Sequence, residues 1–276
     1  MASVEKRRLE TDRGEIEIFI GGGGADASAW TVCAAHPAEP LGEGAAELLA
    51  AASGARVVCV SPRCSTLEEM VDDLEAVRRS REIGRWVFWG MSGGGWLAQI
   101  YAHRYPDALA GIIVESACPC FRERLADPVC VLSPFFPAWR IALESAGLLD
   151  PESHREASPA DDAEWIEIQN VGSVFHRRNG PALLVSPMAV SEGMRRVMPE
   201  LWKFDSRAWL STIRVPTLVL AGTTDPVAPI AHVRAVHEAI PGSRWVAVEG
   251  AGHVPVAERR PEVGEAVRSF LAGALC

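Results

Sequence analysis

The chain has 276 residues, of which 48% are hydrophobic, and it carries a formal net charge of −9 at pH 7. This length suits one large α/β domain or two small ones with a substantial core. The acidic balance disfavours nucleic acid or an anionic membrane as a partner. Residues 1–15 lack the apolar stretch of a signal peptide, and no apolar run is long enough to span a bilayer. We therefore expect a soluble cytoplasmic protein.

The first half of the chain alternates strand-like and helix-like segments. Residues 4–20 alternate about a central Asp-Arg-Gly, which predicts a β-hairpin. A helix is expected over 44–52 and another over 66–80, where Thr66 and Glu69 have the spacing of a capping box. The remaining apolar runs predict strands at 30–35, 56–60, 86–89 and 111–114. Such alternation predicts a mostly parallel sheet with helices on both faces.

The alternation breaks at Cys118, and residues up to about 200 are irregular and rich in proline, aromatic residues and methionine. The pattern then resumes with strands expected at 217–221 and 244–248 and helices at 230–240 and 261–271. We therefore expect an α/β core formed by residues 1–117 and 201–276. A mainly helical cap, residues 118–200, is inserted after the sixth strand. It would cover the carboxyl edge of the sheet, where open α/β sheets bind ligands.

A serine lies between glycines at the turn from the strand 86–89 to the helix-like pattern that starts at Trp96. Gly90 and Gly94 stand two residues before and after Ser92, which is the spacing of a nucleophile elbow. Glycine at these positions removes side chains that would collide in so sharp a turn. The pattern predicts that the Ser92 hydroxyl is raised above the sheet at the positive end of the following helix.

A serine hydroxyl needs a base within hydrogen-bond reach, and the base needs an acid to orient it. Asp225 and His253 each follow a strand of the resumed half, so both belong to the edge of the sheet at which Ser92 lies. The order serine, aspartate, histidine is the one expected for this kind of core. Glu115, at the end of the strand before the cap, is a rival for the role of the acid because it lies at the same edge.

Two segments resemble the capped α/β-hydrolases, a group that includes proline iminopeptidases, C–C bond hydrolases, esterases and lactonases. They are residues 66–117, around GMSGGGW, and residues 215–263, around LAGTTDPVAP and GAGHVPVAE. The resemblance covers nearly the whole chain and is loose only in the cap. It implies that Ser92 is the nucleophile, His253 the base and Asp225 the orienting acid.

The resemblance also implies an oxyanion hole, and here the chain departs from the family pattern. The family carries His-Gly after its third strand, and the residue after that glycine donates a backbone N–H. This chain has His36-Pro37-Ala38, so Ala38 is the expected donor, and Gly93 is the second. The loss of one donor would cost roughly 3 to 4 kcal/mol of transition-state stabilisation.

These features predict a serine hydrolase that forms an acyl-enzyme on a medium-sized, largely apolar ester, lactone or thioester, with no metal or organic cofactor. The weaker candidates for substrate contact are His36, Met91, Trp139, Trp165 and Val254. Cleavage of amides or peptides and cleavage of C–C bonds remain alternatives on the same residues. A non-catalytic ligand receptor is the alternative of another class, since a fold does not fix a function. The sequence leaves homodimer formation open.

Overall fold

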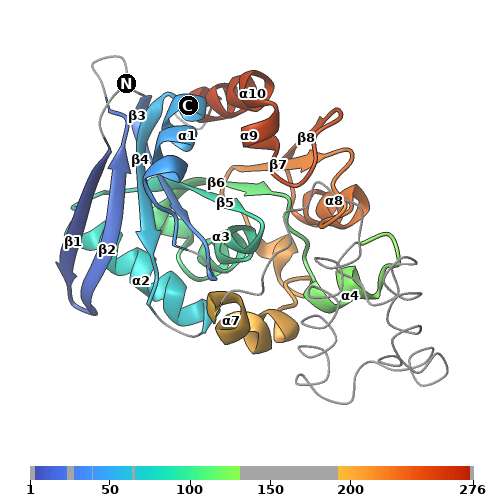
Figure 1. Ribbon diagram of the computed structural model, residues 1–276, viewed down its shortest axis with the longest axis horizontal. Helices are drawn as coiled ribbons and strands as arrows, with labels where there is room; N and C mark the ends of the chain where they lie inside the picture. Colours follow the sequence, from blue (N-terminus) through green and yellow to red (C-terminus); the bar gives the residue numbers. More distant parts are fainter. Residues whose placement is uncertain (1–3, 24–27, 39, 64–65, 131–191, 274–276) are drawn as a thin grey trace, which may run out of the picture.

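The computed structural model describes residues 4–23, 28–38, 40–63, 66–130 and 192–273. It contains an eight-stranded sheet in the order β1-β2-β4-β3-β5-β6-β7-β8 (Figure 1). The strands are β1 Glu5–Thr11, β2 Gly14–Gly21, β3 Ser28–Ala35, β4 Ala55–Ser61, β5 Trp86–Met91, β6 Leu109–Glu115, β7 Thr217–Gly222 and β8 Arg244–Val248. Neighbouring strands from β4 to β8 are parallel, whereas β2 is antiparallel to both β1 and β4. The expected hairpin and mostly parallel sheet are therefore confirmed.

Helices cover both faces of this sheet. They are α1 Glu43–Ser53, α2 Leu67–Ser80, α3 Gly93–Arg104, α4 Phe121–Ala126, α7 Glu192–Lys203, α8 Ile230–Ala239, α9 Pro255–Glu258 and α10 Arg260–Gly273. The buried residues of α2, α3 and α8 form one apolar cluster, and those of α1 and α10 form another on the opposite face (Figure 1). Strand β5 contributes to both clusters because its successive side chains point to opposite faces of the sheet. Trp86 and Phe88 belong to the first cluster, and Val87 and Trp89 belong to the second.

The strand order places a ligand site at one point of the sheet. The chain passes from β3 outward to β4 and then returns to place β5 on the other side of β3. The connections after β3 and β5 therefore leave the sheet in opposite directions and open a crevice between the carboxyl ends of these two strands. His36 follows β3 and Ser92 follows β5, so both residues lie at this crevice.

Helix α2 begins as its sequence predicts. The Thr66 side chain accepts the N–H of Glu69 at 3.3 Å, and the Thr66 hydroxyl donates to the Glu69 carboxylate at 2.8 Å. The expected N-cap is thus confirmed. The Glu69 carboxylate, however, binds the capping hydroxyl itself rather than the Thr66 N–H that a capping box would use.

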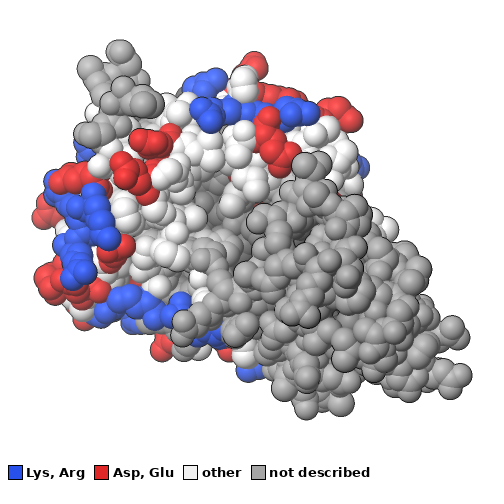
Figure 2. All heavy atoms as spheres, viewed as in Figure 1, with Lys and Arg blue, Asp and Glu red and all other residues white. Residues whose placement is uncertain are grey.

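The hairpin forms one edge of the sheet, and its outer strand β1 is covered with charge. Figure 2 shows acidic and basic side chains interspersed over this region of the molecule. The ion pairs along it are Lys6–Glu17, Arg7–Glu5 and Arg8–Glu15. Their side chains are exposed or, for Glu17, partly exposed, so each pair adds little to stability, but charged side chains on an edge strand discourage pairing with another chain.

The described ends of the range expected as the cap are anchored on α3. The Trp96 ring lies 5.4 Å from the ring of Phe121 in α4 and 5.8 Å from that of Phe204 just after α7, measured between centroids. The Trp96 indole N–H donates to the carbonyl of Cys118 at 3.0 Å. One aromatic residue thus holds both ends of the segment against the helix that follows Ser92. Helix α7 runs across residue 200, where the sequence places the end of the cap.

In the described parts of the chain, no helix is both long enough and apolar enough to cross a membrane. Cys33, Cys59, Cys118 and Cys120 are buried free thiols, and Cys130 is also buried. Burial raises the pKa of the Cys59 thiol to about 12 and also raises that of Cys118. Both thiols therefore stay protonated and poorly nucleophilic at neutral pH.

Candidate active site

Ser92 forms the sharp turn between β5 and α3. Its backbone has φ 51° and ψ −118°, a conformation with positive φ that residues other than glycine rarely adopt. A Cβ at Gly90 would lie 2.1 Å from the carbonyl oxygen of Gly94, and one at Gly94 would lie 2.3 Å from that of Ala35. The two glycines therefore let the helix start pack directly on the strand ends. The Ser92 N–H donates to the main-chain oxygen of Glu115 at 2.8 Å and fixes the turn to β6.

The replacement Gly90→Ala is expected to lower the free energy of unfolding by at least about 4 kcal/mol and to abolish activity. The added methyl group would press on the backbone of Gly94 and Gly95, which cannot rotate away as a flexible side chain would. Urea unfolding measures the effect. Gly84→Ala is the matched control, because a Cβ there meets nothing within 4 Å. Equal stability of the two variants would contradict the packing argument.

The structure brings Ser92, His253 and Asp225 together in one hydrogen-bonded chain. Nε2 of His253 lies 3.0 Å from Oγ of Ser92, and Nδ1 lies 2.9 Å from Oδ2 of Asp225. The carboxylate can only accept, so the neutral imidazole carries its proton on Nδ1 and leaves Nε2 free to accept the serine proton. The imidazole is 19% exposed and the Asp225 side chain is fully buried. This is the geometry that proton removal from a serine hydroxyl requires.

The Asp225 carboxylate is held by its own loop. Its second oxygen, Oδ1, accepts the backbone N–H groups of Val227 at 2.8 Å and Ala228 at 2.9 Å. These are the residues directly after Pro226, so the turn that begins at Asp225 also orients its side chain. Two backbone donors and the imidazole together account for the burial of this carboxylate, which has no arginine or lysine partner among the residues that the structure describes.

The loop that carries His253 is held by Glu258, a residue that the sequence did not single out. Its carboxylate accepts the N–H of Gly252 at 2.7 Å and the N–H of Val254 at 3.0 Å, the two residues that flank the histidine. A Cβ at Gly222 would lie 2.1 Å from the Gly252 carbonyl oxygen, so the ends of β7 and β8 are in direct contact here. A glutamate five residues after a histidine has many uses, and the sequence alone could not indicate this one.

Glu115, the rival acid, does not contact His253. It is fully buried, and its two oxygens accept the indole N–H of Trp89 at 2.7 Å and the N–H of Val256 at 2.8 Å. Burial raises the pKa of the Glu115 carboxyl to about 7, although these two hydrogen bonds act in the opposite direction. The structure therefore assigns the imidazole partner to Asp225 and leaves Glu115 as a separate buried carboxyl beside the site.

The two expected oxyanion donors lie at the start of α3, which is Gly93, and in the loop after β3, which holds Ala38. A Cβ at Gly93 would lie 2.7 Å from Nε2 of His36 and 2.9 Å from the Pro37 ring, so the loop after β3 packs against the residue after Ser92. The Ala38 N–H, however, donates to Nδ1 of His36 at 3.3 Å. The Ala38 N–H expected for the oxyanion is therefore already bound to the His36 imidazole in this structure.

Three of the weaker substrate candidates share one cavity. His36, Met91 and Val254 line a space of about 70 Å³ together with Leu41, Leu48 and Trp89, and nearly all of its wall is apolar. Met91 precedes Ser92 and Val254 follows His253, so this cavity adjoins the hydrogen-bonded chain. Trp139 and Trp165, the other two candidates, lie outside the described residues.

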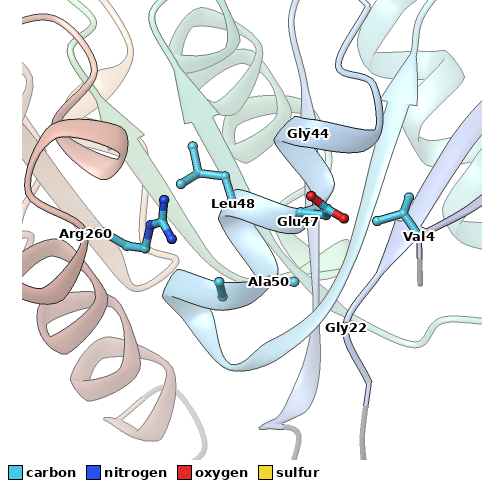
Figure 3. Close-up of a pocket in the computed structure, with 8 residues that line it drawn as sticks. Val4, Gly22, Gly44, Glu47, Leu48, Ala50 and Arg260 are labelled. Atoms are coloured by element: carbon cyan, nitrogen blue, oxygen red, sulfur yellow. The ribbon is translucent and has the colours of Figure 1, made fainter. Parts of the chain in front are cut away.

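A larger hollow of about 380 Å³ lies elsewhere, between α1, α10 and the residues next to β1 and β2 (Figure 3). Its wall includes Val4, Gly22, Glu47 and Arg260, and none of its lining residues is next to Ser92 or His253 in the sequence, unlike Met91 and Val254 of the smaller cavity. Size alone would therefore place the site wrongly, and the chemistry of the side chains locates it instead.

Comparisons with known proteins identify relatives of this chain. The chain is 25% identical over 177 residues to the pimeloyl-[acyl-carrier protein] methyl ester esterase of Aromatoleum aromaticum, covering 61% of this chain and 67% of that protein. It is 25% identical over 221 residues to a probable proline iminopeptidase of Leptolyngbya boryana, covering 69% and 67%.

Solved structures show the same fold. An alpha/beta fold family hydrolase from Bacillus anthracis matches 98% of this chain and 100% of its own, with a TM-score of 0.69 and 21% identity. The enol-lactonase from Burkholderia xenovorans matches 96% of this chain and 100% of its own, with a TM-score of 0.64 and 20% identity. A sequence model of the family described as "Alpha/beta hydrolase family" matches residues 18–266. The protein is therefore a member of the alpha/beta hydrolase family.

Proposed function

We propose that the protein is a serine hydrolase that cleaves a carboxylic ester, lactone or thioester of a medium-sized, largely apolar small molecule. The observation that carries this proposal is the chain of hydrogen bonds from the Ser92 hydroxyl through His253 to Asp225. A serine in a strained turn, with a base at 3.0 Å and a buried acid behind that base, is arranged for nucleophilic attack on a carbonyl carbon.

In the acylation step, His253 takes the Ser92 proton on Nε2 as Oγ bonds to the substrate carbonyl carbon. Asp225 keeps the ring oriented and stabilises its charged form. The tetrahedral oxyanion is stabilised by the N–H of Gly93 and by that of Ala38, which exchanges its 3.3 Å bond to His36 for the negative oxygen. Collapse expels the alcohol or thiol, which takes the proton from His253. A water molecule, deprotonated by the same imidazole, then releases the acid and restores Ser92.

The apolar cavity supports the proposed substrate class. Its wall of Leu41, Leu48, Met91 and Trp89 suits the hydrocarbon part of an acyl group or of a ring and offers little to a charged group. Relatives named as a methyl ester esterase and as an enol-lactonase act on ester bonds, according to their names, and favour the same class.

Peptide or amide cleavage is the second candidate, favoured by the likeness to proline iminopeptidases. The same serine, histidine and aspartate would serve it, so the difference lies in how the substrate's amine is recognised. A panel of p-nitrophenyl esters, lactones, thioesters and amino-acid amides separates the two: we expect kcat/KM to be highest for apolar esters, lactones or thioesters. A clear preference for amino-acid amides would replace this proposal with the second candidate.

A serine-directed fluorophosphonate tests the nucleophile itself. We expect stoichiometric labelling, with the adduct located by mass spectrometry on Ser92, and loss of ester turnover in proportion to the label. Ser116, which directly follows β6, serves as the internal control and should stay unlabelled. Ligand binding by a protein that shows neither label nor turnover would indicate a receptor instead.

A further inference from the structure

Glu115 joins the two loops that carry the proposed nucleophile and base. It is the last residue of β6, and each of its carboxylate oxygens accepts one N–H. One donor is Trp89, three residues before Ser92 on β5, and the other is Val256, three residues after His253 in α9. The Glu115 main-chain oxygen also accepts the Ser92 N–H at 2.8 Å. Glu115 thus contacts both the strand that leads to Ser92 and the helix that follows His253.

We infer that Glu115 is a positioning residue for the proposed serine hydrolase: in its ionised form it ties the strand before Ser92 to the loop after His253 and sets the separation of the two side chains. The inference rests on the proposed function. Glu115 touches no reacting atom, because Asp225 already occupies Nδ1 of the imidazole. Its effect on the reaction therefore passes entirely through the N–H groups of Trp89 and Val256.

Packing alone does not account for a carboxylate at this place. Glu115 is 0% exposed, and the structure gives it two neutral N–H donors but no lysine, arginine or histidine partner among the described residues. A buried carboxylate that lacks a cation is costly to ionise, and an apolar side chain would fill the same space without that cost. Uncompensated groups of this kind are retained where geometry matters more than stability.

The charges that face Glu115 fix the direction of its titration. Burial raises the pKa of Glu115 to about 7, and the acidic residues Glu258 in α9 and Asp225 in the loop after β7 act in the same direction. Above this pH the carboxylate accepts both N–H groups. Below it, one oxygen carries a proton, and the contact to Trp89 or Val256 weakens. Turnover should therefore rise as the pH increases through 7.

The test compares Glu115→Gln with Glu75→Gln. Glu75 is also buried, 6% exposed, and also accepts hydrogen bonds, but these come from Arg78 and Tyr101 and lie away from the site. In Glu115→Gln an amide N–H must face one of the two donors, so we expect kcat to fall roughly 10- to 100-fold with little change in KM. Glu75→Gln should keep the wild-type kcat even if its melting temperature falls.

The pH profile separates positioning from mere stability. Glu115 must lose a proton to hold both loops. The acid limb of log kcat against pH should therefore contain a step near pH 7 in the wild type and in Glu75→Gln. This step should be absent in Glu115→Gln. An unchanged acid limb in Glu115→Gln, or the same change in Glu75→Gln, would overturn the inference.

An NMR titration, which requires no enzymatic activity, keeps this test distinct from that of the proposed function. The indole N–H proton of Trp89 donates to Glu115, so its NMR resonance should shift with a midpoint near pH 7 in the wild type. It should not shift over this range in Glu115→Gln. An indole resonance that is the same at pH 9 in the wild type and in Glu115→Gln would refute the inference about Glu115. Absence of fluorophosphonate labelling with a normal indole titration would instead refute the proposed function.

Discussion

Replacing Ser92 by alanine is expected to lower kcat for a p-nitrophenyl ester by roughly five to six orders of magnitude. The substitution removes the hydroxyl oxygen that lies 3.0 Å from Nε2 of His253, so no covalent intermediate can form at this position. The Gly93 N–H and the substrate cavity remain in this variant. The residual rate should therefore come only from oxyanion stabilisation and substrate binding. The measurement is steady-state turnover after the Ser92→Ala protein has been treated with a fluorophosphonate, which inactivates traces of other serine esterases but finds no hydroxyl at position 92 to label.

Ser92→Gly is the matched variant because the backbone at this residue has φ 51°. Alanine retains the strain of that conformation, whereas glycine relieves it, so Ser92→Gly should be more stable than Ser92→Ala by about 1 kcal/mol in urea unfolding. Both variants should be equally inactive. Ester turnover that survives in either one, at a rate proportional to the protein's concentration, would show that another residue carries the reaction.

The sheet and the place of the site could be predicted because they depend on local patterns. Apolar runs and turn residues indicated the strands, and the positions of Ser92, Asp225 and His253 after three of them followed from the rule that parallel strands end at one edge. The first residues of α3 could not be predicted. Its apolar pattern begins at Trp96, whereas the helix begins at Gly93, because residues 93–95 are glycines and show no periodicity. Their role lies in close packing: a Cβ at Gly95 would meet that of Ala117 at 2.3 Å.

The choice between the two candidate acids required the register of the sheet. Both Asp225 and Glu115 follow or end a strand at the same edge, so spacing could not separate them. In the structure Trp89 pairs with Ile113, and Glu115, two residues further along β6, points to the same face as Ile113. The Glu115 side chain therefore turns toward Trp89 and the α1 side. Asp225 lies beyond the end of β7 in a loop that bends toward His253.

The geometry of the loop that carries Ala38 could not be predicted, for a different reason. A backbone N–H points where the loop's dihedral angles direct it, and no side-chain pattern reports those angles. The sequence could show that Pro37 cannot donate and that Ala38 can. It could not show that the His36 ring folds back to accept the Ala38 N–H at 3.3 Å. The contacts of Glu258 with the two residues beside His253 were hidden for the same reason.

Asp225→Asn is expected to lower kcat by roughly four orders of magnitude while the fold stays intact. The reason lies in the hydrogen bonds of the native carboxylate. Oδ1 accepts the N–H groups of Val227 and Ala228, and only an oxygen can occupy that position. The asparagine amide oxygen must therefore face these two donors, and its NH₂ group must face Nδ1 of His253 at the position of Oδ2. An NH₂ group there forces the imidazole to place its proton on Nε2.

A proton on Nε2 points at Ser92 Oγ and prevents the imidazole from taking the serine proton, so the nucleophile loses its base although every side chain stays within reach. Structure and stability should change little, since the amide satisfies the same backbone donors. This separates Asp225→Asn from Glu115→Gln, which should cost only about one to two orders of magnitude because it acts through Trp89 and Val256 rather than through the tautomer of His253. If Glu115→Gln lowered kcat more than Asp225→Asn does, the acid of the triad would have to be Glu115, and the 2.9 Å contact between Asp225 and His253 would be a feature of the resting protein alone.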